Sequence, residues 1–197
     1  GREFIPAFTK YSTGVFLIEK WRSDNFKLEL ETGLRYDYVY QQVFKWDSKK
    51  RVYNNYEYTY NNVSGSVGAI YKPNSKLTTR VNFGMAWRPP NVSELFSDGL
   101  HHGAAAVEYG DTNLVAERAY NTIVAIDYVN KNFLIQLEGY YNRINNFIYL
   151  KPSIPATLTI KGAFPTFNYT QVDAALTGFD LKMSYQFYLS LFSLHYL

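Results

Sequence analysis

Apolar and polar residues alternate along much of this chain. The longest example covers residues 26–40, where nearly every second residue is apolar or aromatic and the residues between them are mostly charged. A period of two predicts a β-strand with one apolar face. Stronger and weaker versions of the pattern predict seven strands, at residues 11–21, 26–40, 63–72, 77–88, 120–129, 133–142 and 176–190. We therefore expect an all-β fold, an antiparallel up-and-down meander of about 7 to 8 long strands.

The connections alternate in length. Three are short turns, and the other three are predicted as loops of more than twenty residues, at residues 41–62, 89–119 and 145–175. Short turns on one side and long loops on the other are the layout of a bacterial outer-membrane barrel, with the long loops outside the cell.

This layout predicts that the first strand runs inward from the cell exterior. Bacterial barrels of a single chain have an even number of strands, so seven strands predict a segment of a larger barrel. The alternative is a complete eight-stranded barrel with a further strand at residues 55–61 or 157–162.

The two faces of the longest strand differ in a way that suits lipid and water. Tyr36, Tyr38 and Tyr40 precede a long loop on the apolar face, and Trp87 ends another strand, as an interfacial aromatic belt would. The opposite face carries charges of both signs, which suits a watery lumen. Glu29 and Glu31 share that face, but nearby lysine and arginine residues favour lumen lining over a paired-carboxylate hydrolase.

Composition excludes several classes of protein. The chain has no cysteine, which rules out disulfides, thiolate metal sites and a cysteine nucleophile. Its net charge of +3 does not indicate a nucleic-acid partner. No apolar run is long enough for a membrane helix. The aromatic share of 18% fits a barrel wall that faces lipid.

The second long connection of the pattern and the strands beside it carry recognisable motifs. Residues 87–96 read WRPPNVSELF, residues 99–103 read GLHHG, residues 108–118 read EYGDTNLVAER, and residues 138–148 read EGYYNRINNFI. In order and spacing they resemble the barrel region of TonB-dependent outer-membrane receptors, over roughly residues 1–196. Asp111-Thr112 and Ala116 depart from the family pattern, which has Asn-Pro and proline there.

The resemblance implies that residues 1–197 are a segment of a 22-stranded transmembrane barrel in the bacterial outer membrane, without its N-terminal plug domain. It implies a transporter and not an enzyme, which takes up an iron–siderophore or another metal complex, haem, cobalamin or a glycan. The implied partners are outer-membrane lipid, the plug domain and TonB. No cofactor is expected in the segment itself.

The motif residues suggest structural roles. Pro89 and Pro90 cannot donate hydrogen bonds to a strand partner and end their strand. Inside a barrel mouth the charges of Arg88, Glu94, Glu108, Glu117 and Arg118 need partners, and we expect pairing among them in preference to ligand contact. We expect the remaining motif residues to be structural as well: Leu95, Gly110, Asn113 and Leu114.

His101 and His102 are the best candidates for metal contact, because neutral imidazoles suit zinc, copper, nickel and iron. Glu108 and Asp111 lie close enough in sequence to complete such a site. A structural or lumen-facing role for the two histidines is the competing interpretation. Two other interpretations of the whole chain stay open here: a soluble β-sandwich that binds carbohydrate or peptide, and a small complete outer-membrane barrel.

Overall fold

The computed structural model describes residues 3–25, 27–47 and 50–187. Within them lie nine strands and one helix. In chain order they are β1 (Ala7–Arg22), β2 (Leu28–Asp47), β3 (Val52–Asn74), β4 (Leu77–Arg88), α1 (Val92–Phe96), β5 (Asp98–His101), β6 (Ala106–Tyr109), β7 (Glu117–Asn130), β8 (Phe133–Thr159) and β9 (Gly162–Tyr185).

All these strands form one sheet in the order β1-β2-β3-β4-β7-β8-β9-β6-β5. The seven long strands pair with their sequence neighbours in antiparallel fashion, which confirms the predicted meander. A single sheet is not a β-sandwich. The short strands β5 and β6 and helix α1 were not predicted, and β6 pairs with β9 in parallel. Phe26 and residues 188–190, at the ends of two predicted strands, lie outside the described residues.

Two of the three predicted long loops are wrong. β2 and β3 continue their pairing up to Asp47 and Val52, and β8 and β9 continue up to Thr159 and Gly162. The suggested extra strands at residues 55–61 and 157–162 are parts of these extended hairpins. Backbone pairing needs no apolar face, so strands that rise above a membrane into water lose the alternating pattern and keep their hydrogen bonds.

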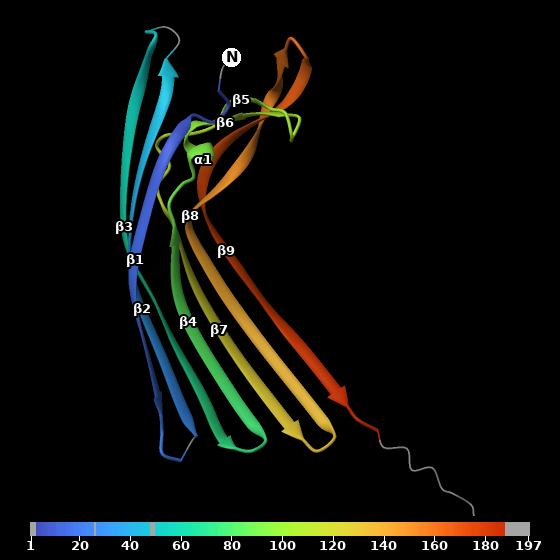
Figure 1. The fold of residues 1–197 in the computed structure, drawn as a ribbon. Helices are drawn as coiled ribbons and strands as arrows, with labels where there is room; N and C mark the ends of the chain where they lie inside the picture. Colours follow the sequence, from blue (N-terminus) through green and yellow to red (C-terminus); the bar gives the residue numbers. More distant parts are fainter. Residues whose placement is uncertain (1–2, 26, 48–49, 188–197) are drawn as a thin grey trace, which may run out of the picture.

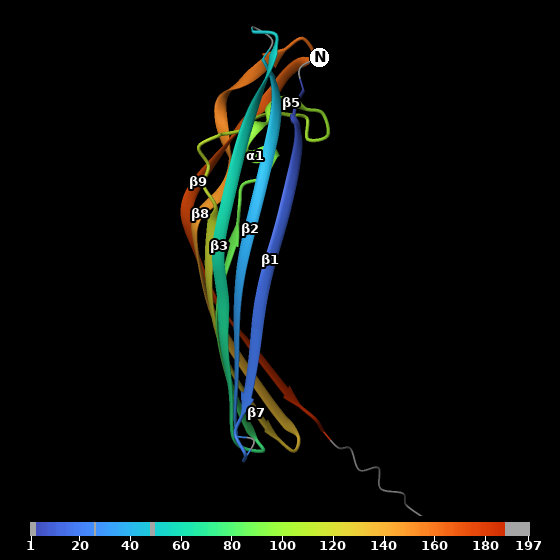
Figure 2. The same ribbon diagram turned by 60° about the vertical axis from the view of Figure 1, so that its left-hand side comes forward.

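The sheet is long and curved, with the short turns at one end and the extended hairpins at the other (Figures 1 and 2). Both views place α1 on the concave side, between β1–β3 and β8–β9, near the end that carries the extended hairpins. We call this concave side the inner face and the opposite side the outer face.

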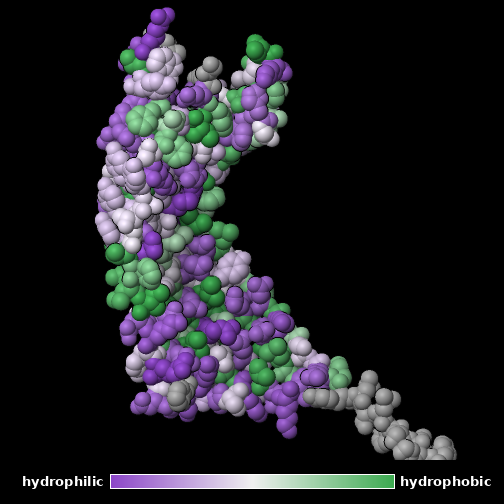
Figure 3. Space-filling view, viewed as in Figure 1, coloured by the Kyte–Doolittle hydropathy of each residue, from purple (hydrophilic) through white to green (hydrophobic). Residues whose placement is uncertain are grey.

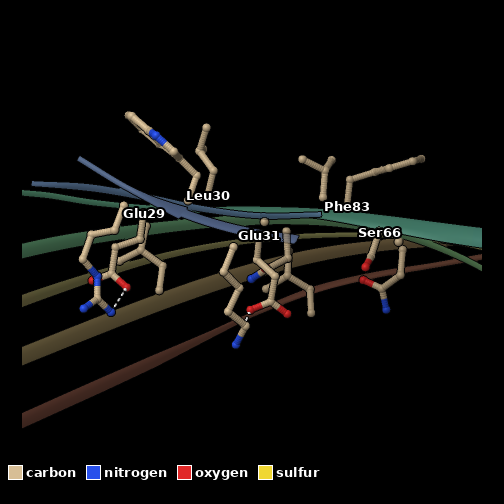
Figure 4. Close-up of a pocket in the computed structure, with 15 residues that line it drawn as sticks. Glu29, Leu30, Glu31, Ser66 and Phe83 are labelled. Carbon is tan, nitrogen blue, oxygen red and sulfur yellow. Dashed lines mark hydrogen bonds and ion pairs between the residues drawn. The ribbon is translucent and has the colours of Figure 1, made fainter. Parts of the chain in front are cut away.

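The outer face carries exposed apolar side chains on every long strand. One from each strand, between 42% and 68% exposed, gives the set Leu17, Leu34, Val67, Phe83, Val124, Leu137 and Leu181. Figure 4 shows the alternation directly: Leu30 and Phe83 point to one side of the strands, and Glu29, Glu31 and Ser66 point to the other. An apolar surface of this extent is unusual on a soluble monomer and suits contact with lipid. None of the described helices has the length and apolar character to cross a membrane.

Aromatic residues border this apolar surface at both ends. Tyr36, Tyr38 and Tyr40 lie on the outer face of β2, as predicted. Exposed aromatic residues also line the outer face near the short turns: Trp21, Tyr71, Tyr128 and Tyr185. Trp87 does not join a belt, because its indole N–H donates to the Asp37 carboxylate on the inner face at 3.2 Å.

The inner face toward the short turns is lined by ion pairs. Glu29 pairs with Arg22 at 2.9 Å and Lys72 at 3.1 Å, and Glu31 pairs with Lys20 at 2.8 Å. Both carboxylates are neutralised as expected for lumen lining. They border a pocket of about 680 Å³ (Figure 4). Figure 3 shows mostly hydrophilic residues over the lower half of the face in view.

Candidate functional site

The most distinctive feature of the inner face is the connection between β4 and β7, residues 89–116, which we call the inner segment. It contains α1, β5 and β6 and packs against the sheet instead of extending away from it (Figures 1 and 2). β4 ends at Arg88, directly before Pro89 and Pro90, because proline cannot continue the ladder of hydrogen bonds.

Arg88 joins the two ends of the inner segment. Its guanidinium donates to both oxygens of Glu94 at 2.8 and 2.9 Å and to Glu117 at 2.9 Å. Both carboxylates are acceptors for a guanidinium, which carries a positive charge at any physiological pH. Since Glu94 lies in α1 and Glu117 begins β7, one cation fixes the segment at its start and its end.

The same two carboxylates also accept backbone hydrogen bonds. Glu94 accepts the N–H of Asn91 at 2.7 Å, which satisfies a donor at the start of α1. Glu117 accepts the N–H of Ile148 at 2.5 Å, next to an irregularity in the pairing of β8 with β9. The network thus connects the inner segment to Ile148 of β8, which follows Glu117 by 31 residues.

An apolar core lies between the inner segment and the sheet. Leu95, Phe96 and Leu114 are 1%, 2% and 6% exposed, and they pack with Val43 of β2 and Ile148 of β8. Val92 completes the buried cluster, with Tyr58 and Tyr169 packed against it. Strands β2 and β8 are not neighbours in the sheet, so the inner segment fills the space that sheet curvature opens between them.

Gly110 allows the closest backbone approach in the segment. A Cβ atom at this position would lie 2.5 Å from the carbonyl carbon of Leu95 and the nitrogen of Phe96. The Gly110 N–H donates to the Ser97 carbonyl at 2.8 Å. Only glycine fits here, because the neighbouring atoms are backbone and cannot rotate away.

The turn after Gly110 is held by side-chain amides and carboxylates. The Asp111 carboxylate accepts the backbone N–H of Asn113 at 2.9 Å and its side-chain amide at 3.0 Å. Farther along, the Gln171 side chain accepts from the Val115 N–H and donates to the carbonyls of Val115 and Asn146. Sequence reasoning missed Gln171, since no local pattern relates it to a segment 56 residues away.

The β5–β6 hairpin of the inner segment carries an imidazole–carboxylate pair. His101 Nδ1 lies 2.8 Å from Glu108 Oε1, and the Tyr169 hydroxyl donates to Glu108 Oε2 at 3.4 Å. The Glu108 side chain is 7% exposed, whereas that of His101 is 45% exposed. Burial raises the pKa of Tyr169 to about 12, so its hydroxyl remains protonated and able to donate. Tyr169 was not predicted as part of this site.

The four residues predicted as possible metal ligands do not form one cluster. His101 and Glu108 are together, His102 lies in the exposed turn after β5, and Asp111 holds the turn at Asn113. In residues 3–25, 27–47 and 50–187, no group of three or more histidine, aspartate or glutamate side chains is placed to hold a metal ion. The eight motif residues predicted as structural, Arg88, Pro89, Glu94, Leu95, Gly110, Asn113, Leu114 and Glu117, all lie in the framework described above.

Comparison with known proteins identifies a family for nearly the whole chain. Residues 2–196 match the family model described as TonB dependent receptor-like, beta-barrel. No curated protein matches the sequence.

Solved structures resemble the fold at low sequence identity. The copper transporter OprC is 21% identical with a TM-score of 0.70, over 91% of this chain and 27% of that one. The hemophore receptor HasR of Serratia marcescens is 16% identical with a TM-score of 0.68, over 93% and 33%. The FrpB iron transporter of Neisseria meningitidis is 19% identical with a TM-score of 0.58, over 91% and 23%. The chain thus spans a quarter to a third of their length, and the likeness concerns the fold alone.

Proposed function

Because this chain belongs to the TonB-dependent receptors, we propose that it is part of an outer-membrane importer for an iron–siderophore or another metal complex. Receptors of this family are transporters and not enzymes, and their barrels lie in the bacterial outer membrane. The partners that follow from the family are a plug domain, the energy-coupling protein TonB and the surrounding lipid. The apolar outer face is suited to the last of these.

The observation that carries the metal-complex proposal is the placement of His101 and Glu108. They belong to β5 and β6 of the inner segment, and Figure 1 shows these two strands close to the end of the sheet that bears the extended hairpins. A cargo that enters from outside would reach this end first. Imidazole is a ligand for iron, copper, nickel and zinc, whereas sugars are usually bound by stacking and neutral hydrogen bonds. The names of three similar structures, a copper transporter, a hemophore receptor and an iron transporter, agree with this choice.

Uptake by cells tests the proposal. Cells that lack the receptor and cells that carry the full-length gene would be supplied with radiolabelled iron–siderophore, iron porphyrin, copper, cobalamin or labelled oligosaccharide. We expect receptor-dependent uptake of one of the metal complexes, and we expect it to stop when TonB is deleted. Receptor-dependent uptake of oligosaccharide alone would overturn the proposal.

A further inference from the structure

Two arginines on the outer face lie where the apolar surface ends. We propose that Arg118 of β7 and Arg143 of β8 together bind the phosphate group of a lipid in the outward leaflet of the membrane. The apolar side chains beside them on the outer face contact the acyl chains of the same lipid. This site is separate from the inner segment, and it does not depend on which cargo the receptor imports.

The register places both side chains on the outer face. Glu117 reaches Arg88 on the inner face, so the next residue of β7, Arg118, points to the outer face. Along β8, Arg143 and the outer-face residue Leu137 are an even number of positions apart, and such residues share a face. The pairing of β7 with β8 has no register shift, so both assignments hold along the whole pair.

On both strands the side chains follow the order of the layers at a membrane surface. Toward the extended hairpins the outer face changes from apolar to tyrosine to arginine: Val124, Tyr120 and Arg118 on β7, and Leu137, Tyr141 and Arg143 on β8. An apolar band, an aromatic border and then a cation match the hydrocarbon, the interface and the headgroup of a lipid leaflet. The arginines therefore lie at the level of lipid phosphates.

The two arginines are close enough to hold one phosphate group. Arg118 lies opposite Asn145 and Arg143 lies opposite Tyr120, so the two arginines are diagonal neighbours. Diagonal neighbours in an antiparallel pair are about 7–8 Å apart, which two long side chains can span. A guanidinium binds phosphate oxygens through paired hydrogen bonds, so arginine is well suited to this ligand.

Both guanidinium groups have donors available. Within the described part of the chain the exposed side chain of Arg118 has no hydrogen bond or ion pair. Arg143 donates through Nε to Asn145 Oδ1 at 3.1 Å, and its side chain is 55% exposed. Its Nη2 lies 3.7 Å from Asp173 Oδ2, which is longer than a hydrogen bond. The two arginines outnumber this carboxylate, so the cluster keeps a positive charge.

Arginines on the inner face are paired differently. Arg35 lies 2.6 Å from Asp37, and Arg88 lies 2.8 Å from Glu94. On the outer face of a barrel, a cation is costly at the middle of the membrane, and the cost falls toward the interface. An anionic lipid surface turns this cost into an attraction. A lipid phosphate thus supplies for Arg118 and Arg143 the negative charge that carboxylates supply inside.

Lipid binding by the full-length receptor tests the proposal. The receptor in neutral detergent is titrated with radiolabelled lipid A that carries two phosphate groups. One arginine near an anionic lipid changes affinity about fivefold, so Arg118→Gln and Arg143→Gln should each weaken binding about fivefold and the double variant about 25-fold. Lipid A without phosphate should bind the native receptor and the double variant alike. Arg35→Gln is the matched control, an inner-face arginine 49% exposed, and should bind as the native receptor does.

A conservative variant separates charge from folding. Arg118→Lys keeps the positive charge, so it should bind phosphorylated lipid A more tightly than Arg118→Gln. Native binding by the double variant, or equal loss of phosphorylated and phosphate-free lipid A, would overturn the proposal. Displacement of the lipid by inorganic phosphate, beyond that caused by sodium chloride at the same ionic strength, would also overturn it, because it would indicate a site for a soluble anion.

Discussion

Gly110 offers a sharp test of how tightly the inner segment is packed. In Gly110→Ala the new methyl carbon would lie 2.5 Å from Leu95 C and Phe96 N and 2.7 Å from Leu95 O. Ordinary carbon contacts begin near 3.5 Å, so the backbone at Gly110 and the backbone at Leu95 and Phe96 must separate by roughly 1 Å. The hydrogen bonds from Gly110 N to Ser97 O and from Asp111 N to Glu94 O, at 2.8 and 3.0 Å, would then exceed normal length.

Overpacking of this kind costs about 1–3 kcal/mol. Because 1.4 kcal/mol corresponds to a tenfold change in an equilibrium, the population of the opened segment should rise by roughly 5- to 150-fold. Hydrogen exchange measures this directly, through faster exchange of the amides of residues 91–116 in the full-length receptor, while amides of β1 and β2 keep their rates.

Gly103→Ala is the matched control. Gly103 lies in the same segment, and the nearest atoms to its added Cβ would be the His101 side chain at 3.7 and 3.9 Å, which is ordinary contact. We expect exchange close to that of the native receptor. If Gly110→Ala and Gly103→Ala exchanged alike, the steric argument for glycine at position 110 would be refuted.

Three further predictions concern the core, the Gln171 contact and the outer face. Leu95→Ala, at a position 1% exposed, should destabilise the inner segment by about 2–5 kcal/mol, measured as faster hydrogen exchange of the amides of residues 91–116. Unchanged exchange would show that the core does not hold the segment. Gln171→Leu removes both hydrogen bonds to Val115 and should lower the free energy of local opening at Val115 by about 1–3 kcal/mol, measured as faster hydrogen exchange of its amide. Exchange at the native rate would mean that other contacts hold Val115 in place. Phe83→Arg on the outer face should destabilise the receptor in vesicles by about 2–4 kcal/mol in a urea titration, while Asn121→Arg on the inner face should be tolerated; equal losses would contradict the assignment of faces.

The motif between β4 and β7 shows where sequence reasoning reached its limit. Pairing of Arg88 with Glu94 and Glu117 was foreseeable, since the charges of this segment need partners in a barrel mouth. The contacts with Ile148 and Gln171 were not, because those residues belong to strands whose nearness depends on the curvature of the sheet. Likewise, the sequence does not distinguish His101 from His102. Only the register of β5 with β6 shows that Glu108 contacts the half-exposed ring of His101, whereas His102 lies in the turn.

Local alternation along the chain was enough to predict the seven long strands, their antiparallel order and the division into an apolar and a polar face. These follow from a period of two, which is a local property wherever one face meets lipid. Tertiary structure alone decided how far the hairpins extend and where the inner segment lies. In the extended hairpins both faces of the strands meet water, so the strands pair there without an alternation of apolar and polar residues. A segment that packs across the sheet is placed by contacts between residues far apart in the chain, which no local pattern records.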